Sequence, residues 1–259
     1  MIKSQEYEYK GLMAQTWDLL RGDPSGRGDR DFYLEIIQHY GEPVLEVGCG
    51  TGRLLLDYLE VGIDIDGVDI SPEMLALCLE KADARHLIPN VFQQSIESLS
   101  LPRRYRTVIA SSSVLQLIVD VEAVRQAVAR IYAHLLPGGA LVAPFMTLWQ
   151  EGMPLQAEWE KVAIREEDGA MLQRMGRVWY DPQDECEHTE DLYQVLLDGV
   201  VVAVEHHHRS PSARSYSQPH ARRLFENAGF ADVRLLRGFT QEPATEDNLL
   251  FTVVGSKPV

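Results

Sequence analysis

A glycine-rich turn that follows an acidic residue is the part of this sequence best suited to chemistry. Residues 44–56 read as an apolar strand containing Glu46, a turn through Gly48, Gly50 and Gly52, and a leucine-rich start of a helix. Glycines spaced two apart allow positive φ angles and leave no Cβ between the main chain and a ligand. Main-chain N–H groups at the start of a helix can then face that ligand. The pattern predicts a nucleotide-type binding turn.

The spacing and the charge of the turn indicate which nucleotide it suits. In the dinucleotide pattern G-x-G-x-x-G the third glycine would fall on Arg53. Glu46 would repel a pyrophosphate and attract a ligand with a positive end, such as the ammonium and sulfonium of S-adenosylmethionine. These two features disfavour a nicotinamide oxidoreductase. The stretch 46–52 resembles the first motif of the class I S-adenosylmethionine-dependent methyltransferases.

A second acidic residue supports this resemblance. Asp69 ends the next apolar strand, about 20 residues past the first glycine, where a carboxylate accepts hydrogen bonds from ribose hydroxyls. Ser71 is a suitable N-cap for the helix that follows, with Pro72 at its first position. The resemblance further implies that Ile70 and Met74 form a wall against the adenine. Taken together, the cofactor-binding residues expected are Glu46, Gly48, Cys49, Gly50, Gly52, Asp69, Ile70, Met74, Ser95, Ile96 and Ser111.

Ser95, Ile96 and Ser111 enter that set by their places in the resemblance. Ser95 and Ile96 stand where the family commonly has an Asp-Ala pair at the adenine edge, so ordinary loop residues remain an alternative for them. Ser111 follows a fourth strand, beside the expected position of the methionine part of the cofactor. The serines there carry no Pro-Pro-Tyr type signature of adenine or protein-amide methylation.

The remaining landmarks agree with the resemblance in order and spacing. A helix is predicted over 121–136 and ends at Pro137-Gly138-Gly139, the turn that precedes the fifth strand. A late helix at 221–229 and strands near 233–236 and 249–255 complete the pattern. We therefore expect an α/β fold with a doubly wound, seven-stranded Rossmann-like sheet whose last strand is antiparallel.

An insert interrupts this core after the fifth strand. Four β-type runs, 159–167, 171–180, 188–197 and 200–208, are separated by Asp-Gly or Asp-Pro turns. The insert is similar to those of aminosugar and glycine-type N-methyltransferases, where it covers the substrate pocket or builds a dimer. We expect one domain made of an N-terminal helical cap, the cofactor-binding core, the antiparallel insert and the end of the core (1–40, 41–145, 146–217 and 218–259).

The acceptor chemistry is less defined. An amine acceptor needs mainly to be neutral and desolvated, whereas a hydroxyl or carbon acceptor usually needs a base. Tyr216 and His207 are the candidate catalytic residues, and Trp17, Met146 and Arg214 the candidate substrate contacts. The His206–His208 run could instead be a polar strand face or a metal site. No carboxylate or cysteine completes a metal site at suitable spacing there, so we expect no metal.

Composition narrows the partners. The formal net charge of −15 disfavours nucleic acid and anionic lipid as partners. The three cysteines show no paired spacing, and neither a membrane-spanning run nor a secretion signal is seen, which favours the cytoplasm. We expect a methyltransferase that uses S-adenosyl-L-methionine to methylate N or O of a small molecule, with a homodimer as an option. A catalytically silent cofactor-binding partner subunit is the alternative.

Overall fold

The computed structural model describes residues 9–22 and 28–259. Contacts between Cα atoms divide these residues into two compact units. The sheet unit comprises residues 28–147 and 216–259. The insert unit comprises residues 9–22 and 148–215. Each unit has its own hydrophobic core and its own β-sheet, so each is described by itself.

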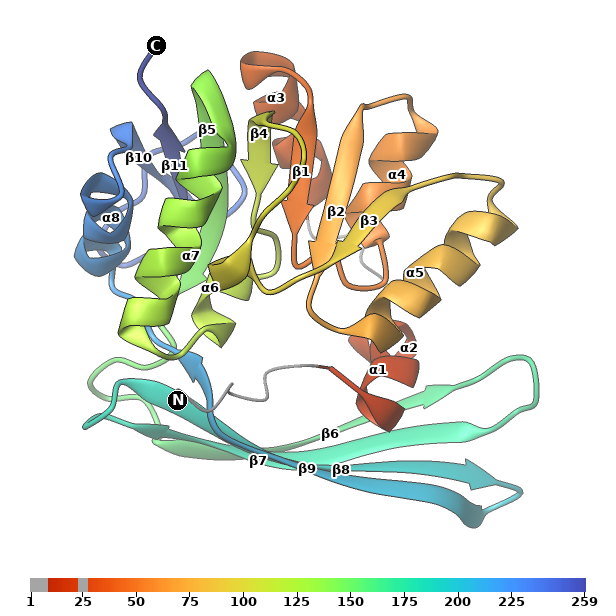
Figure 1. The fold of residues 1–259 in the computed structure, drawn as a ribbon. Helices are drawn as coiled ribbons and strands as arrows, with labels where there is room; N and C mark the ends of the chain where they lie inside the picture. The colour runs from red at the N-terminus through yellow and green to blue at the C-terminus, as the bar shows by residue number, and fades with distance from the viewer. Residues whose placement is uncertain (1–8, 23–27) are drawn as a thin grey trace. The chain divides into compact units, whose positions relative to one another are not determined.

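The sheet unit contains the predicted seven-stranded sheet (Figure 1). Its strand order is β10-β11-β5-β4-β1-β2-β3, in which β1 to β5 run parallel and β11 is antiparallel to both of its neighbours. This confirms the fold expected from the sequence. The strands are β1 (Val44–Val47), β2 (Ile65–Asp69), β3 (Asn90–Gln93), β4 (Tyr105–Ile109), β5 (Leu135–Met146), β10 (Ala231–Arg237) and β11 (Leu250–Ser256).

Helices cover both faces of this sheet, because successive residues of a buried strand point to opposite sides. Val44 and Ile109 pack on one face with α3 (Asp29–Tyr40), α4 (Arg53–Glu60) and α5 (Pro72–Ala84). Leu45 and Val108 pack on the other face. There they meet α6 (Val114–Leu117), α7 (Val121–His134), α8 (Gln218–Asn227) and the short 3₁₀ turn Ile96–Ser98. Burial of each such aliphatic side chain stabilises the fold by about 1.5–3 kcal/mol.

Two helix boundaries test the sequence reading. The Ser71 side chain accepts a hydrogen bond from the Met74 N–H at 3.1 Å, which confirms the predicted N-cap of α5. Helix α7 ends at His134, and the predicted turn at residues 137–139 lies within β5 instead. The reason is that Leu135 already pairs with Tyr105, with a register shift before the next pair.

The insert unit holds the four antiparallel strands that the sequence predicts, in the order β6-β7-β8-β9. Asp198 and Gly199 both have positive φ (51° and 78°) in a two-residue hairpin, which is where Asp-Gly pairs are favoured. Strand β9 continues to Arg214 rather than ending near His208, and it accommodates Pro211 because it is an edge strand. The strands are β6 (Gln156–Ile164), β7 (Met171–Asp181), β8 (Cys186–Leu197) and β9 (Val200–Arg214).

The N-terminal segment is divided between the two units. The expected N-terminal helical cap begins with two short helices, α1 (Gly11–Gln15) and α2 (Trp17–Arg21). Thr16 separates them, and its hydroxyl donates to the Leu12 carbonyl at 2.6 Å in competition with regular helix bonding. Both helices pack on the insert sheet, whereas α3 packs on the seven-stranded sheet. Across the described ranges, 9–22 and 28–259, no helix combines the length and apolarity needed to cross a membrane.

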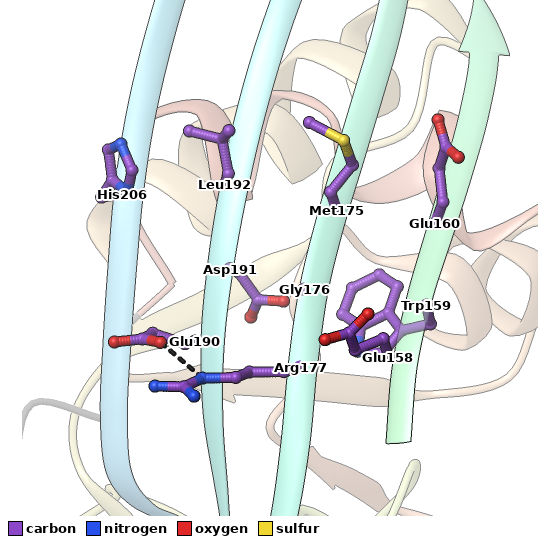
Figure 2. A pocket seen from close by; sticks show the side chains of 10 residues that line it. All are labelled: Glu158, Trp159, Glu160, Met175, Gly176, Arg177, Glu190, Asp191, Leu192 and His206. Atoms are coloured by element: carbon purple, nitrogen blue, oxygen red, sulfur yellow. Dashed lines mark hydrogen bonds and ion pairs between the residues drawn. The ribbon is translucent and has the colours of Figure 1, made fainter. Parts of the chain in front are cut away.

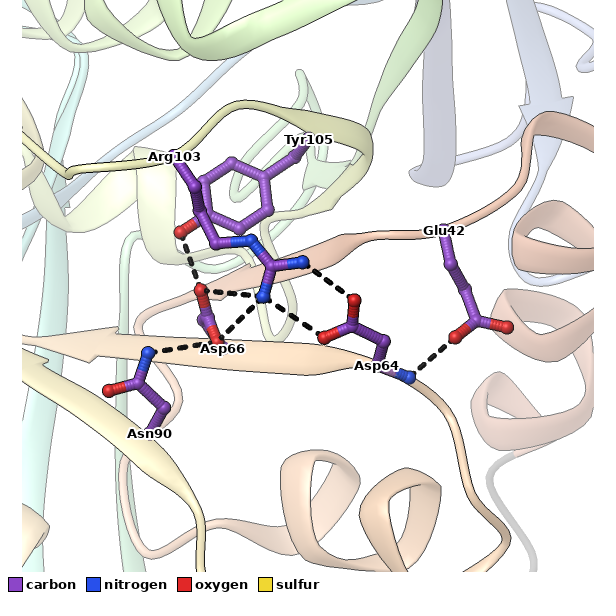
Figure 3. Close-up of polar contacts among 6 residues, drawn as sticks. All are labelled: Glu42, Asp64, Asp66, Asn90, Arg103 and Tyr105. Atoms are coloured by element: carbon purple, nitrogen blue, oxygen red, sulfur yellow. Dashed lines mark hydrogen bonds and ion pairs between the residues drawn. The ribbon is translucent and has the colours of Figure 1, made fainter.

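A buried polar network joins three strands of the sheet unit at their amino ends (Figure 3). The carboxylate of Asp66 is 2% exposed and accepts hydrogen bonds from the Tyr105 hydroxyl at 2.8 Å and the Asn90 amide at 3.1 Å. Arg103 forms an ion pair with Asp64 at 2.6 Å and reaches Asp66 at 3.5 Å. These contacts link β2, β3 and β4 at the edge opposite to the glycine turn.

We expect Tyr105→Phe to lower the free energy of unfolding by about 1.5–3 kcal/mol, because it removes a hydrogen bond to a buried carboxylate. Urea unfolding followed by circular dichroism measures the change. Tyr40→Phe is the matched control, because the Tyr40 hydroxyl accepts an exposed hydrogen bond, from Arg234 at 3.2 Å. Equal losses in the two variants would contradict the role given to the buried network.

Candidate functional site

Two glycines of the turn after β1 lie where no other residue fits. Gly48 and Gly52 have φ of +70° and +81°. A Cβ on Gly48 would approach the Val114 side chain to 2.5 Å, and one on Gly52 would approach the Cys78 sulfur to 2.5 Å. Both positions therefore exclude a side chain by conformation and by space.

The main-chain N–H groups of the turn donate to acceptors within the protein, whereas the sequence suggested that they face a ligand. Those of Gly48 and Cys49 both donate to the Val68 carbonyl, at 2.7 and 3.0 Å, and that of Gly52 donates to the Cys49 carbonyl at 2.9 Å. The Gly50 N–H donates to the Asp69 carboxylate. The N–H groups of Gly48, Cys49, Gly50 and Gly52 are therefore bonded within the protein, and the glycines let Val114 and Cys78 pack closely against the turn.

Asp69 organises the edge of the sheet beside this turn. Its Oδ2 accepts the Gly50 N–H at 2.8 Å and its Oδ1 accepts the Ser71 N–H at 2.9 Å. One carboxylate therefore joins the glycine turn to the start of α5. Each carboxylate oxygen can accept two hydrogen bonds, so this arrangement is compatible with further donors from a ligand diol.

Glu46 is a buried carboxyl group with an unused acceptor. Its side chain is 2% exposed, and its Oε1 accepts a hydrogen bond from the Ser111 hydroxyl at 2.8 Å. Its Oε2 is buried, with no hydrogen-bond partner among the residues that the structure describes. Burial raises the pKa of Glu46 to about 7, opposed by the Ser111 hydrogen bond and the positive charge of Arg53. Such a group suits a cationic hydrogen-bond donor.

The surroundings of Glu46 include residues that the sequence did not single out. Arg53 donates two hydrogen bonds to the Asp29 carboxylate, at 3.0 and 2.5 Å. The Tyr33 hydroxyl is buried, again without a partner in the described part of the chain. Burial raises the pKa of Tyr33 well above its ordinary value, and the negative charges of Asp29 and Glu46 add to the effect. From the sequence, Arg53 was notable only because it replaces the third glycine of the dinucleotide pattern. Its ion pair could not be predicted, because Asp29 lies 24 residues away on another helix.

The residues expected around the adenine all belong to the sheet unit. Met74 is 4% exposed, and its methyl group lies 3.3 Å from the place of a Cβ on Gly50. Ile96 is 6% exposed, Ile70 is partly buried, and the Ser95 hydroxyl contacts the Ser98 hydroxyl at 2.8 Å. The contacts given by the structure thus bring Met74 to the glycine turn and pair Ser95 with its own loop.

Two further candidates from the sequence lie in the sheet unit. The ring of Tyr216 is in the hydrophobic core, with its centroid 5.1 Å from that of Phe145. Met146 is 40% exposed, and its main chain is fixed by the Gln116 side chain through hydrogen bonds of 2.7 and 2.9 Å. The sequence did not predict a role for Gln116, a polar side chain that the fold buries to 2% exposure.

The other three candidates lie in the insert unit. His207 contacts the Glu205 carboxylate at 3.0 Å, and that carboxylate also accepts the Leu12 N–H at 2.7 Å. Arg214 forms an ion pair with Glu185 at 3.6 Å. Trp17 lines a cavity of about 110 Å³ together with Met13, Thr16, Leu20, Arg21, Lys161, Arg174 and Tyr193. His207 and Arg214 therefore both have acidic partners within their own unit.

A larger hollow lies on the insert sheet (Figure 2). It has a volume of about 580 Å³, and its lining includes the acidic residues Glu158, Glu160, Glu190 and Asp191. The ion pair of Arg177 with Glu190, at 2.7 Å, crosses it on the surface, where such a pair contributes less than about 1 kcal/mol. All of its lining comes from the insert unit: Glu158, Trp159, Glu160, Met175, Gly176, Arg177, Glu190, Asp191, Leu192 and His206.

Comparisons with known proteins agree with this geometry. A family model described as a methyltransferase domain matches residues 44–139, the range that contains Glu46, the glycine turn, Asp69 and Ser111. Residues 44–139 therefore form an S-adenosylmethionine-dependent methyltransferase domain. A solved S-adenosylmethionine-dependent methyltransferase from Clostridium acetobutylicum shares the fold, with a TM-score of 0.75 at 16% identity over 95% of this chain and 97% of that one.

Two curated relatives differ in how much of this methyltransferase they match. A malonyl-[acyl-carrier protein] O-methyltransferase from Serratia marcescens is 33% identical over 42% of this chain and 40% of its own length. A dTDP-3-amino-3,6-dideoxy-alpha-D-glucopyranose N,N-dimethyltransferase from Streptomyces fradiae is 23% identical over 86% of each chain. The chain spans about half, or less, of the length of the first curated relatives it matches.

The residues of the sheet unit fit the family's cofactor, S-adenosyl-L-methionine. The unused buried acceptor of Glu46 suits the cofactor's ammonium. The Asp69 carboxylate can accept from a ribose diol while it holds the turn.

We expect the buried Glu46 to make the ligand-free protein less stable as pH rises. Its folded pKa of about 7 exceeds its ordinary value of 4.5, so the folded state holds the proton more tightly between those values. The contribution is fully present below pH 4.5 and is lost as pH rises through 7, a total of about 3 kcal/mol. Urea unfolding at pH 5, 6, 7 and 8 should give a flatter profile for Glu46→Gln than for wild type. Glu60→Gln, on the exposed end of α4, should leave the profile unchanged, and identical profiles for wild type and Glu46→Gln would contradict the assignment.

Proposed function

We propose that this methyltransferase transfers a methyl group from S-adenosyl-L-methionine to the neutral amine nitrogen of a small metabolite, with amino sugars as the first acceptor class. The choice of nitrogen as the acceptor atom rests on the burial of the two candidate bases, Tyr216 and His207. Tyr216 is 6% exposed and its ring packs against Phe145, and the His207 side chain is 13% exposed, so neither is open to an acceptor hydroxyl. An amine acceptor needs no strong base, whereas a hydroxyl usually does.

The extent of the comparisons supports the same acceptor class. The match to the amino-sugar N,N-dimethyltransferase extends over 231 residues, so it must run through the insert. The match to the O-methyltransferase covers 110 residues, about the length of the cofactor-binding core alone. In this family the shared core binds the cofactor, so a likeness that includes the insert is the better guide to the acceptor.

The chemistry asks little of the protein beyond positioning. When bound, S-adenosyl-L-methionine supplies a methyl group activated by its positively charged sulfur. The acceptor nitrogen contributes its electron pair to the new N–C bond as the S–C bond breaks, and the product amine then loses a proton to solvent. Asp69 would hold the nucleoside end beside the glycine turn, and Glu46 would orient the cofactor's ammonium. Positioning of this kind supplies much of the rate of a displacement.

We expect Asp69→Ala to weaken S-adenosylhomocysteine binding about 10- to 150-fold, because hydrogen bonds to a charged group contribute about 1.5–3 kcal/mol. Isothermal calorimetry measures the dissociation constant, and circular dichroism checks that the variant is folded. Asp57→Ala is the control, since that carboxylate pairs with Arg85 at 2.9 Å on the next helix. Wild-type affinity in Asp69→Ala would refute the cofactor site.

The acceptor proposal is tested by a product screen. Wild-type protein with labelled S-adenosyl-L-methionine is offered free and nucleotide-linked 3- and 4-amino sugars, glycine, and matched hydroxyl sugars. Mass spectrometry should show a gain of one or two methyl groups on an amino sugar and none on its hydroxyl counterpart. Tyr216→Phe and His207→Gln should retain more than about a tenth of this activity, because a general base contributes 10²–10⁴-fold. Exclusive methylation of hydroxyls, or a 100-fold loss in either variant, would contradict the proposal.

A further inference from the structure

Three potential metal ligands meet at the turn between β7 and β8 in the insert unit. Asp181 ends β7, Asp184 lies in the turn, and His188 is near the start of β8. One ligand atom from each residue lies within 4.8 Å of the others. Acidic turns of this kind are common on protein surfaces, so the case depends on the histidine.

His188 is buried and held from two sides. The residue is 7% exposed, its ring stacks on Trp179 at 5.3 Å with a 9° tilt, and its Nδ1 contacts the Ser210 hydroxyl at 2.7 Å. Its Nε2 lies 3.2 Å from Oδ2 of Asp184, yet it is buried and forms no hydrogen bond within the described chain. A histidine whose second nitrogen is fixed by a hydrogen bond while the first lies among carboxylates is the usual arrangement of a metal ligand.

The two carboxylates are oriented by the main chain. Oδ1 of Asp181 accepts the Gln183 N–H and Oδ1 of Asp184 accepts the Cys186 N–H, each at 2.8 Å. Each group therefore keeps its other oxygen for a further partner. The third carboxylate of the turn, that of Glu185, is instead paired with Arg214.

We propose that Asp181, Asp184 and His188 bind one divalent cation of the zinc class. Two carboxylates balance its charge, and an imidazole favours Zn²⁺ over Ca²⁺ or Mg²⁺, which prefer oxygen. Two ligand atoms bound to a tetrahedral zinc lie about 3.3–3.5 Å apart, close to the 3.2 Å between His188 and Asp184. The ion would join β7, its turn and β8, and Ser210 would connect it to β9. This role is structural, and it does not depend on the proposed function.

The test uses the untagged 259-residue chain freed of metal. Calorimetry with ZnCl₂ should show one ion per chain, with MgCl₂ and CaCl₂ at least tenfold weaker, and zinc should raise the thermal midpoint. Asp184→Asn and His188→Gln should each weaken zinc binding tenfold or more. Because His188 is buried and its variant could fail to fold, Asp181→Asn, on the partly exposed turn, provides a second test with the same expected loss.

Two control variants separate this site from nonspecific binding. Glu185→Gln removes the same charge from the same turn, and His206→Gln removes an exposed imidazole of the insert sheet. Both should bind zinc as wild type does. The proposal is overturned if wild type binds no zinc, if Asp184→Asn and His188→Gln bind it unchanged, or if either control weakens binding as much as they do.

Discussion

Parallel pairing of β1 with β2 and β4 is the constraint on which the candidate cofactor site depends. In this register Glu46 lies beside Gly67 on one strand and Ile109 on the other, so the next residues of all three strands reach one edge of the sheet. Asp69 and Ser111 come to that edge from chain positions far from Glu46. The hydrogen bonds from Gly50 to Asp69 and from Ser111 to Glu46 then connect the three strand ends.

Two carboxylates at this edge of the sheet, those of Asp69 and Glu46, differ in their hydrogen bonding. Asp69 accepts two main-chain N–H groups and stabilises the turn, whereas Glu46 is buried with one acceptor unused. A buried carboxyl group without full compensation costs stability, which is acceptable where a ligand later supplies the missing partner. The positive charge of Arg53, which is held in place by Asp29, moderates this cost.

The insert unit has an internal organisation of its own. Helices α1 and α2 cover part of one face of its sheet, and the ion pair of Arg174 with Asp191, at 2.9 Å, is buried beneath Trp159. Glu205 fixes the start of α1 and holds His207. His207, a candidate catalytic residue, therefore shares its carboxylate partner with the start of α1.

The sequence by itself determined the seven-stranded sheet, the four-stranded insert, the cap of α5 and the family, because these depend on local periodicity, turn residues and short motifs. Tertiary structure alone decided that Arg53 pairs with Asp29, that Gln116 fixes Met146, and that helices α1 and α2 pack on the insert sheet. Each of these is a contact between residues distant in the chain, and no local pattern encodes it. The hydrogen bonding of the glycine turn depends on tertiary structure for the same reason. The sequence shows the glycines, but the acceptor for the Gly48 and Cys49 N–H groups is the Val68 carbonyl of the neighbouring strand.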